Sequence, residues 1–292
     1  MRSSDIGGDF VLDPVPEHVP EIVLVEGELS VKEVIPNPNN VNIAQYAVAE
    51  VPQELQAYHG VDLEVEMIEK IDVLNGGFVR LVDWMGDDLS IVRSARVSYD
   101  ADWREGDEQK DAKLIAYLMK NRHTSPFESV SFSFEVKAPI FVFRQWHRHR
   151  TWAYNEISAR YTELDEGWYV PEVEQITTQS TSNKQMRTKD QHPQAFFMRD
   201  VINDQCAFSF KRYKELIEQG CPRELARSVL PVAAYSRMFA TVNLHNLFHF
   251  LRLRLHEHSQ YEIRVYAEAM LALIEPIVPV SVMEFKKTLT QG

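Results

Sequence analysis

Cysteine is scarce in this chain of 292 residues, and long apolar runs are missing. Its two cysteines, Cys206 and Cys221, are too few for a disulfide scaffold or a four-cysteine zinc site, and they suit a reducing compartment. No run of about 18 apolar residues occurs, so we expect no membrane-spanning helix. The first residues lack a basic region followed by an apolar stretch, which predicts no secretory signal and favours a cytoplasmic location.

Two familiar motifs are also absent. The sequence contains neither Gly-x-Gly-x-x-Gly nor a Walker loop, so nothing predicts a dinucleotide-binding fold. His-Glu-x-x-His is missing too, although His245 and His249 stand four residues apart and His256 and His258 follow them. We therefore expect no metal site.

Basic residues are few, with 31 Lys and Arg against 43 Asp and Glu, giving a net charge of −12. This balance argues against a general nucleic-acid coat. Residues 1–60 hold ten acids, two bases and six of the 14 prolines. We expect an acidic, partly disordered extension over 1–60 and a folded domain over 65–290. Hydrophobic residues make up 45 % of the whole chain, which is enough for a sizeable core.

Hydrophobic periodicity predicts the elements of that domain. The predicted strands are 67–73, 78–84 and 129–136, and the predicted helices are 88–97, 110–119, 196–218, 222–230, 236–255 and 260–277. The polar stretch 175–195 is expected to be a mobile surface loop. The predicted fold class is α+β, with a small twisted, mainly antiparallel sheet flanked by helices and with long C-terminal helices.

The most informative segment runs from Arg144 to Arg150 and contains three arginines and two histidines. Like charges packed together repel one another, and an anion relieves that cost because guanidinium groups suit phosphate oxygens. Apolar residues 140–143 should tie this segment to the core. Further on, Arg252 and Arg254 lie on roughly opposite sides of a predicted helix, so one of them should point inward and need a polar or anionic partner.

These residues resemble a known family. Arg148-His149-Arg150, followed after seven residues by Ser158, matches the signature of the flavin-dependent thymidylate synthases. Other blocks match in order and spacing: 81–90, 95–98, 123–128, 223–227 with 230–231, 241–243, and 253–254 followed by His258. Together they cover about residues 70–285 and leave out the acidic extension.

The resemblance implies an FAD-dependent methyltransferase that converts dUMP to dTMP, with NADPH and methylenetetrahydrofolate as co-substrates. It implies a homotetramer with sites between subunits, and Arg254 as the catalytic group that activates the uracil ring. No cysteine nucleophile is required. The implied flavin contacts are Ser125, Arg148, His149, Arg150, Glu156, Asn243, Leu244, His245 and His249. The implied substrate contacts are His123, Gln145, Trp146, His147, Arg148, Glu156, Ile157, Ser158, Ala159, Arg160, Arg227 and Arg254.

An alternative function is an RNA-binding module that uses segment 144–160. In that case Trp146, Trp152 and Tyr154 would serve as stacking platforms for bases. RNA binders want a broad basic face, whereas the positive charge here is confined to one short segment of an acidic chain. We therefore favour the flavoenzyme and expect no nucleic-acid polymer as a partner.

Overall fold

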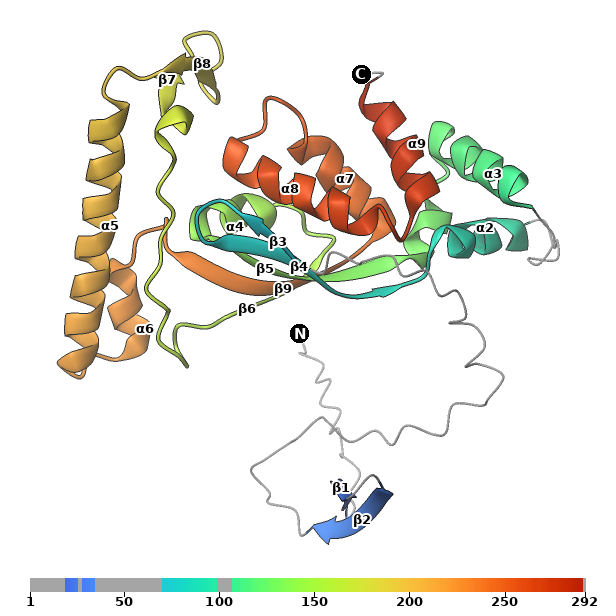
Figure 1. Ribbon diagram of the computed structural model, residues 1–292, viewed down its shortest axis with the longest axis horizontal. Coiled ribbons are helices and arrows are strands. Elements are labelled where there is room, and N and C mark those ends of the chain that lie inside the picture. Colours follow the sequence, from blue (N-terminus) through green and yellow to red (C-terminus); the bar gives the residue numbers. More distant parts are fainter. Residues whose placement is uncertain (1–18, 26–27, 35–69, 99–106, 291–292) are drawn as a thin grey trace, which may run out of the picture. The chain divides into compact units, whose positions relative to one another are not determined.

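The computed structural model describes residues 19–25, 28–34, 70–98 and 107–290. The chain divides into two compact units, Met1–Leu63 and Glu64–Gly292. In the first unit, strand β1 (Val19–Val25) pairs antiparallel with β2 (Glu28–Val34). The disorder expected within residues 1–60 otherwise concerns residues outside the described ranges. The remaining helices and strands belong to the second unit (Figure 1).

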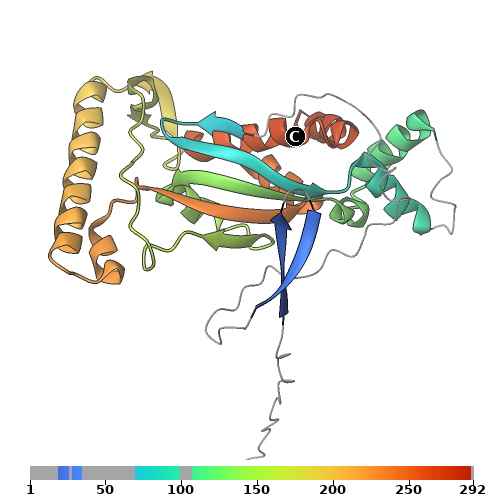
Figure 2. The ribbon, with the colours of Figure 1, turned by 60° about the horizontal axis from the view of Figure 1, so that its bottom comes forward.

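The centre of the second unit is a five-stranded sheet with the strand order β3–β4–β5–β9–β6, in which all neighbours pair antiparallel. Its strands are β3 (Lys70–Val73), β4 (Gly77–Met85), β5 (Ser131–Pro139), β6 (Ala153–Glu156) and β9 (Tyr235–Asn243). Figure 2 shows the twist of this sheet. The predicted fold class is confirmed, and the first two predicted strands correspond to β3 and β4.

Strand β5 forms where the apolar alternation predicts it. Phe132 and Phe134 are fully buried on one face of the sheet. The opposite face carries Glu135, whose carboxylate lies between Arg80 on β4 and Arg237 on β9, at 3.3 and 3.4 Å. The two faces of the sheet therefore differ in character, and only the first is an apolar core.

Residues 236–255 do not form the single long helix that the sequence predicted. Strand β9 occupies the first half, and helix α7 (Leu244–Arg254) follows it. Met238 is buried while Phe239 beside it is exposed, which is the period of a strand. Pairing with β5 on one side and β6 on the other selects the strand over the helix. Asn243 then starts α7, because its side chain accepts a hydrogen bond from the backbone N–H three residues on, at 2.9 Å.

Helices α4 (Ile140–Trp146), α7 and α8 (Tyr261–Ile274) cover the apolar face of the sheet (Figure 1). The predicted helices 88–97 and 110–119 are confirmed as α2 (Asp88–Val97) and α3 (Glu108–Lys120), which lie with α9 (Pro279–Leu289) at one end. Within the described part of the chain, no helix combines the length and apolar character needed to cross a bilayer.

A close approach fixes α8 on the sheet. The Tyr266 hydroxyl donates to the backbone carbonyl of Lys137 on β5 at 2.9 Å. It lies directly above Gly77, where any Cβ atom would collide with that hydroxyl. A glycine is therefore required at the start of β4, and the position of α8 is defined by a buried hydrogen bond.

The other end of the sheet carries α5 (Ala195–Glu218), α6 (Arg223–Ala226) and the 3₁₀ turn η4 (Arg227–Val229). The predicted helix 196–218 is confirmed as α5. The predicted helix 222–230 is shorter than expected, because its second half tightens into η4. Gly220, after α5, has a φ of +79°, which suits glycine at a helix end.

The stretch 175–195 is more ordered than predicted. After the turn η3 (Val173–Gln175), strands β7 (Thr177–Gln179) and β8 (Arg187–Gln191) pair antiparallel as a small hairpin. The prediction of a loop was wrong because the hairpin is held by polar groups rather than by an apolar face. The hydroxyls of Thr178 and Thr188, for example, form a hydrogen bond of 2.6 Å across the two strands.

Candidate active site

The basic segment 144–150 begins on the last turn of α4 and continues past its end. Pro139 ends β5, and Val142 and Phe143 bury their side chains as predicted. Trp146 is fully buried and stacks on Phe250 of α7 at 4.9 Å between ring centroids. The apolar side of α4 therefore holds the segment on the core, and its polar residues emerge at a fixed place.

Arg254, the last residue of α7, is the inward-pointing arginine that the helix geometry predicts. Its Nε donates to Nε2 of His149 at 3.1 Å, and one terminal nitrogen donates to the backbone carbonyl of Gln145 at 3.2 Å. Arg252 instead donates to the Thr288 hydroxyl at 3.1 Å and is exposed. One guanidinium is thus held against the basic segment at two of its three nitrogens.

His149 is neutral in this arrangement. It is only 7 % exposed, and burial lowers its pKa to about 4, with electrostatic interactions with Arg254 and His249 acting in the same direction. A neutral imidazole that accepts at Nε2 carries its proton on Nδ1. Burial also lowers the pKa of Arg254, but a guanidinium keeps its charge near neutral pH. His149 therefore orients a charged Arg254 without repelling it.

Three arginines of the segment remain free. The side chains of Arg144, Arg148 and Arg150 are exposed, and they form no hydrogen bond or ion pair within the described part of the chain. The Nε2 atom of His147 is buried and also has no partner there. This donor set fits a phosphate-bearing cofactor such as FAD, since its oxygens would satisfy groups that the protein leaves unpaired.

A second arginine cluster lies on α6, the adjoining turn η4 and the loop after β6. Arg160 Nε lies 3.7 Å from the Glu224 carboxylate, and Arg227 Nε donates to the Glu224 backbone carbonyl at 3.3 Å. The Ser158 hydroxyl accepts from the backbone N–H of Arg160 at 3.3 Å. The structure thus brings together three predicted substrate contacts. Glu224, which joins them, was not among the predicted site residues, although it lies in the matching block 223–227.

The two arginine clusters are separate within one chain. Figure 1 shows α6, which carries Arg223–Ala226, well to the left of α7. Gln145, His149, His249 and Arg254 gather at α4 and α7, since the rings of His149 and His249 are also in contact, at 6.1 Å between centroids. Arg160 and Arg227 gather at α6.

The other predicted contacts divide by how their side chains are placed. The Glu156 carboxylate accepts a hydrogen bond from the Ser236 hydroxyl at 2.6 Å. The backbone N–H of Ile157 donates to the backbone carbonyl of Arg237 at 2.8 Å. The side chains of Trp146, Ala159 and Leu244 lie in the interior, so only their backbone groups could face a ligand. His123, in edge contact with Tyr117, and Ser125 on the turn η2 (Ser125–Ser129) are exposed, and Asn243 and His245 are half-buried.

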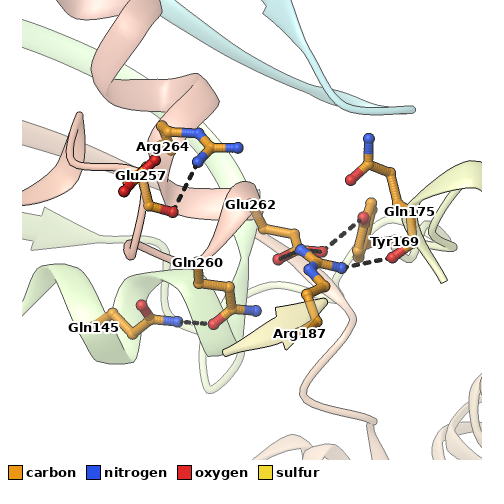
Figure 3. A network of polar contacts seen from close by, with 8 residues as sticks. All are labelled: Gln145, Tyr169, Gln175, Arg187, Glu257, Gln260, Glu262 and Arg264. Atoms are coloured by element: carbon orange, nitrogen blue, oxygen red, sulfur yellow. Dashed lines mark hydrogen bonds and ion pairs between the residues drawn. The ribbon is translucent and has the colours of Figure 1, made fainter. Parts of the chain in front are cut away.

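Figure 3 shows a polar network beside α4 that the sequence did not reveal. The side-chain amide of Gln145 donates to that of Gln260, the residue immediately before α8. Two residues later, the buried Glu262 accepts hydrogen bonds from Arg187 and Tyr169. These partners are 75 and 93 positions away from Glu262, so no local pattern could have joined them.

The RNA-binding alternative does not survive this packing. Trp146 is fully buried, and Trp152 is 7 % exposed. The Tyr154 hydroxyl donates to the backbone carbonyls of Trp146 and His149, at 3.2 and 2.8 Å. The two tryptophan rings are therefore not free to stack on a base, and the half-buried Tyr154 ring already stacks on Trp152 at 6.1 Å between centroids.

No group of three or more His, Cys, Asp or Glu side chains gathers as metal ligands among the described residues. Cys206 is buried on α5, and burial raises the pKa of its thiol, which disfavours the reactive thiolate.

The chain is similar to several known proteins. Residues 80–280 match the family model described as thymidylate synthase complementing protein. A flavin-dependent thymidylate synthase of Treponema denticola is 46 % identical over 226 residues, which cover 76 % of this chain and 83 % of the relative. One from Thermus thermophilus is 48 % identical over 227 residues, covering 76 % and 80 %. A UMP/dUMP methylase, PolB from Streptomyces cacaoi, solved with 5-Br dUMP, superposes with a TM-score of 0.68 at 36 % identity, covering 74 % of this chain and 97 % of that one.

Proposed function

This chain belongs to the flavin-dependent thymidylate synthase family. We propose which of its residues act in the reaction, which bind dUMP and which bind the flavin. The protein is an FAD-dependent methyltransferase that converts dUMP to dTMP, with methylenetetrahydrofolate as the carbon donor. Bound FAD, reduced by NADPH, supplies the hydride. We assign this activity to residues 65–290, with residues 1–60 as an acidic extension outside the catalytic domain, and a cytoplasmic location remains a prediction.

The arrangement of Arg254 carries the assignment of the catalytic residue. Uracil C6 becomes electrophilic only when negative charge on N3 and the ring carbonyls is stabilised. A guanidinium can stabilise that charge without giving up its proton. His149 and the Gln145 carbonyl hold two nitrogens of Arg254, while its remaining terminal nitrogen has no partner among the described residues. That free nitrogen is the donor we assign to the uracil ring.

The second cluster is suited to the phosphate of dUMP. Arg160 and Arg227 are exposed and bound only loosely, so their guanidinium groups can turn toward phosphate oxygens. Ser158 adds a hydroxyl beside them. The full set that we propose for dUMP is His123, Gln145, Trp146, His147, Arg148, Glu156, Ile157, Ser158, Ala159, Arg160, Arg227 and Arg254, with the buried members acting through their backbone.

The free arginines of segment 144–150 are suited to the flavin. Arg148 and Arg150 would pair with the pyrophosphate. The buried His149, which lies between them in the sequence, would hold the two arginines in position. The half-buried His245 and exposed His249 can donate hydrogen bonds to a ring or ribose. The proposed flavin set is Ser125, Arg148, His149, Arg150, Glu156, Asn243, Leu244, His245 and His249.

We propose that the active enzyme is a homotetramer with sites between subunits. One chain separates the clusters at Arg254 and at Arg227, so a site that uses both needs more than one copy. Helix α5 offers a contact surface, because Phe196 and Phe197 are 72 % and 64 % exposed and Phe208 is 52 % exposed. Soluble monomers rarely expose so many large apolar side chains on one helix.

Reconstitution tests these assignments. The purified chain should take up added FAD and turn yellow, and it should form dTMP when all substrates are supplied. Light scattering should give a mass four times that of the chain. Phe208→Glu should lower that mass and the activity together. Arg254→Ala should lose dTMP formation while keeping FAD and mass. Full turnover by Arg254→Ala would contradict the catalytic role of Arg254. Full turnover by a monomer would contradict the proposal of sites between subunits.

A further inference from the structure

A buried carboxylate outside the proposed ligand contacts lies beside the site (Figure 3). Glu262, in the first turn of α8, is 3 % exposed. It accepts two hydrogen bonds from one guanidinium nitrogen of Arg187, at 3.0 and 2.9 Å, and one from the Tyr169 hydroxyl at 3.1 Å. A buried charge is stable only with such partners. Tyr169 remains a donor, because burial and the neighbouring Glu262 carboxylate raise the pKa of its phenol.

Arg187 brings the β7–β8 hairpin to this carboxylate. Its other terminal nitrogen donates to the Gln175 backbone carbonyl at 2.8 Å, which fixes the guanidinium on η3, and its side chain also lies over the Tyr261 ring at 5.8 Å. The other hydrogen bonds of the hairpin that involve described residues stay within 173–194. Arg187 is therefore the hydrogen-bonded link between this hairpin and α8.

The same turn of α8 reaches the site. Gln260, two residues before Glu262, accepts a hydrogen bond from the side chain of Gln145. The backbone carbonyl of Gln145 in turn accepts from Arg254 at 3.2 Å. A shift in the first turn of α8 would therefore move Gln145, and with it one of the two acceptors that orient Arg254.

We propose that Arg187, Tyr169 and Glu262 form a lock that positions Arg254. The lock holds the first turn of α8, Gln260 transmits this position to Gln145, and Gln145 presents its carbonyl to the guanidinium. The three are positioning residues, because none of them belongs to the proposed substrate or flavin contacts. The proposal rests on the proposed role of Arg254 and adds the polar hairpin 177–191 to the machinery of the site.

A matched set of variants tests the lock in the FAD-loaded enzyme. Arg187→Met should lower kcat about 10- to 100-fold, because a shift of about 1 Å in a catalytic group has effects of that size. The KM for dUMP should change less than about threefold, since the phosphate cluster at Arg227 is untouched. Arg187→Lys, which keeps the charge, should recover part of kcat. Lys286→Met, which breaks the exposed 2.6 Å contact with Glu275 at the other end of α8, should leave kcat unchanged.

Two further variants separate positioning from stability. Arg187→Met leaves the Glu262 carboxylate unpaired and should lower the melting temperature. Arg187→Met with Glu262→Leu replaces the pair with apolar groups, so it should recover melting temperature but not kcat. Gln260→Ala should lower kcat by itself and add little to Arg187→Met, because both act along one path.

Three results would overturn the lock: wild-type kcat in the apolar double variant, additive losses with Gln260→Ala, or a kcat loss as large in Lys286→Met. If Arg254→Ala is inactive while every lock variant turns over normally, the lock fails and the proposed function stands. If Arg254→Ala itself is active, the proposed role of Arg254 fails first.

Discussion

The two arginine clusters of the chain differ in how firmly they are held. Arg254 is half-buried and hydrogen-bonded to a neutral imidazole and a carbonyl, within 3.1 and 3.2 Å. The side chains of Arg160 and Glu224 are 55 % and 57 % exposed, and their closest approach is 3.7 Å. The first cluster is set before any ligand arrives, whereas the second is free to adapt.

This difference matches what each cluster must do. A group that stabilises charge developing in a reaction works best when it is fixed in advance and shielded from water. A group that captures a phosphate needs only charge and access, and exposed ion pairs contribute about 0–1 kcal/mol to stability. Removing Arg254 should therefore affect chemistry, and removing Arg160 or Arg227 should affect binding.

The largest expected effect is that of Arg254→Ala. Its kcat/KM for dTMP formation should fall at least about 1,000-fold, because Arg254 is the group that we assign to the charge developing on the uracil ring. The absorbance of bound FAD should remain, since the arginines of segment 144–150 are unchanged. Arg252→Ala, at the exposed neighbour, is the control and should stay within about threefold of wild type. Equal losses in both variants would erase the distinction between an inward and an outward arginine.

The next effect tests the neutral imidazole through pH. The folded pKa of His149 is about 4, below the ordinary value of 6.5, so the unfolded chain binds more protons between these limits. The contribution of the neutral His149 to the free energy of unfolding is complete above pH 6.5. It is lost as the pH falls through 4, by up to about 3 kcal/mol. Urea midpoints of the FAD-free protein at one concentration should decline over this window. His149→Gln should flatten the decline, and an unchanged slope would mean that His149 is not held neutral.

The sequence was informative where one short segment carries the evidence. The basic run 144–150 and the apolar residues before it predicted a charged segment tied to the core. Helical spacing alone predicted that either Arg252 or Arg254 turns inward. These inferences held because they depend on local geometry, which neighbouring residues determine.

Prediction from the sequence failed where the structure of a segment depends on contacts with distant segments. Residues 236–243 became a strand because β5 and β6 flank them, and hydrophobic spacing cannot detect that pairing. The sequence predicts a loop over 175–195 rather than the hairpin 177–191, because the stabilising partner of Arg187 in that hairpin, Glu262, lies 75 residues away. Gln260 and Glu224 were missed for the same reason: each acts through a contact with a remote arginine or amide.

The exposed cluster should respond to mutation in binding alone. Arg160→Ala or Arg227→Ala should raise the KM for dUMP about 10-fold and lower kcat less than about threefold, because each removes one charge from the phosphate and none from the ring. The urea midpoint should hardly change, as expected for a surface pair. Steady-state kinetics with dUMP varied at saturating co-substrates measures this. A loss confined to kcat would assign the cluster to chemistry and remove the contrast with Arg254.

Salt should produce the smallest effect and the sharpest contrast. The chain carries a net charge of −12, so only local positive charge can attract an anionic nucleotide. Exposed charges are screened over about 10 Å at 0.1 M salt, while buried groups are screened much less. Raising NaCl from about 0.05 to 0.5 M should therefore increase the KM for dUMP a few-fold and leave kcat nearly constant.

In the double variant Arg160→Ala with Arg227→Ala, the salt dependence of the KM should shrink, because the screened charges are gone. Arg254→Lys should keep the full salt dependence at its lower kcat. If the double variant retained the wild-type salt slope, the attraction would have to come from the free arginines of segment 144–150, and the division between a fixed catalytic cluster and an adaptable phosphate cluster would need to be redrawn.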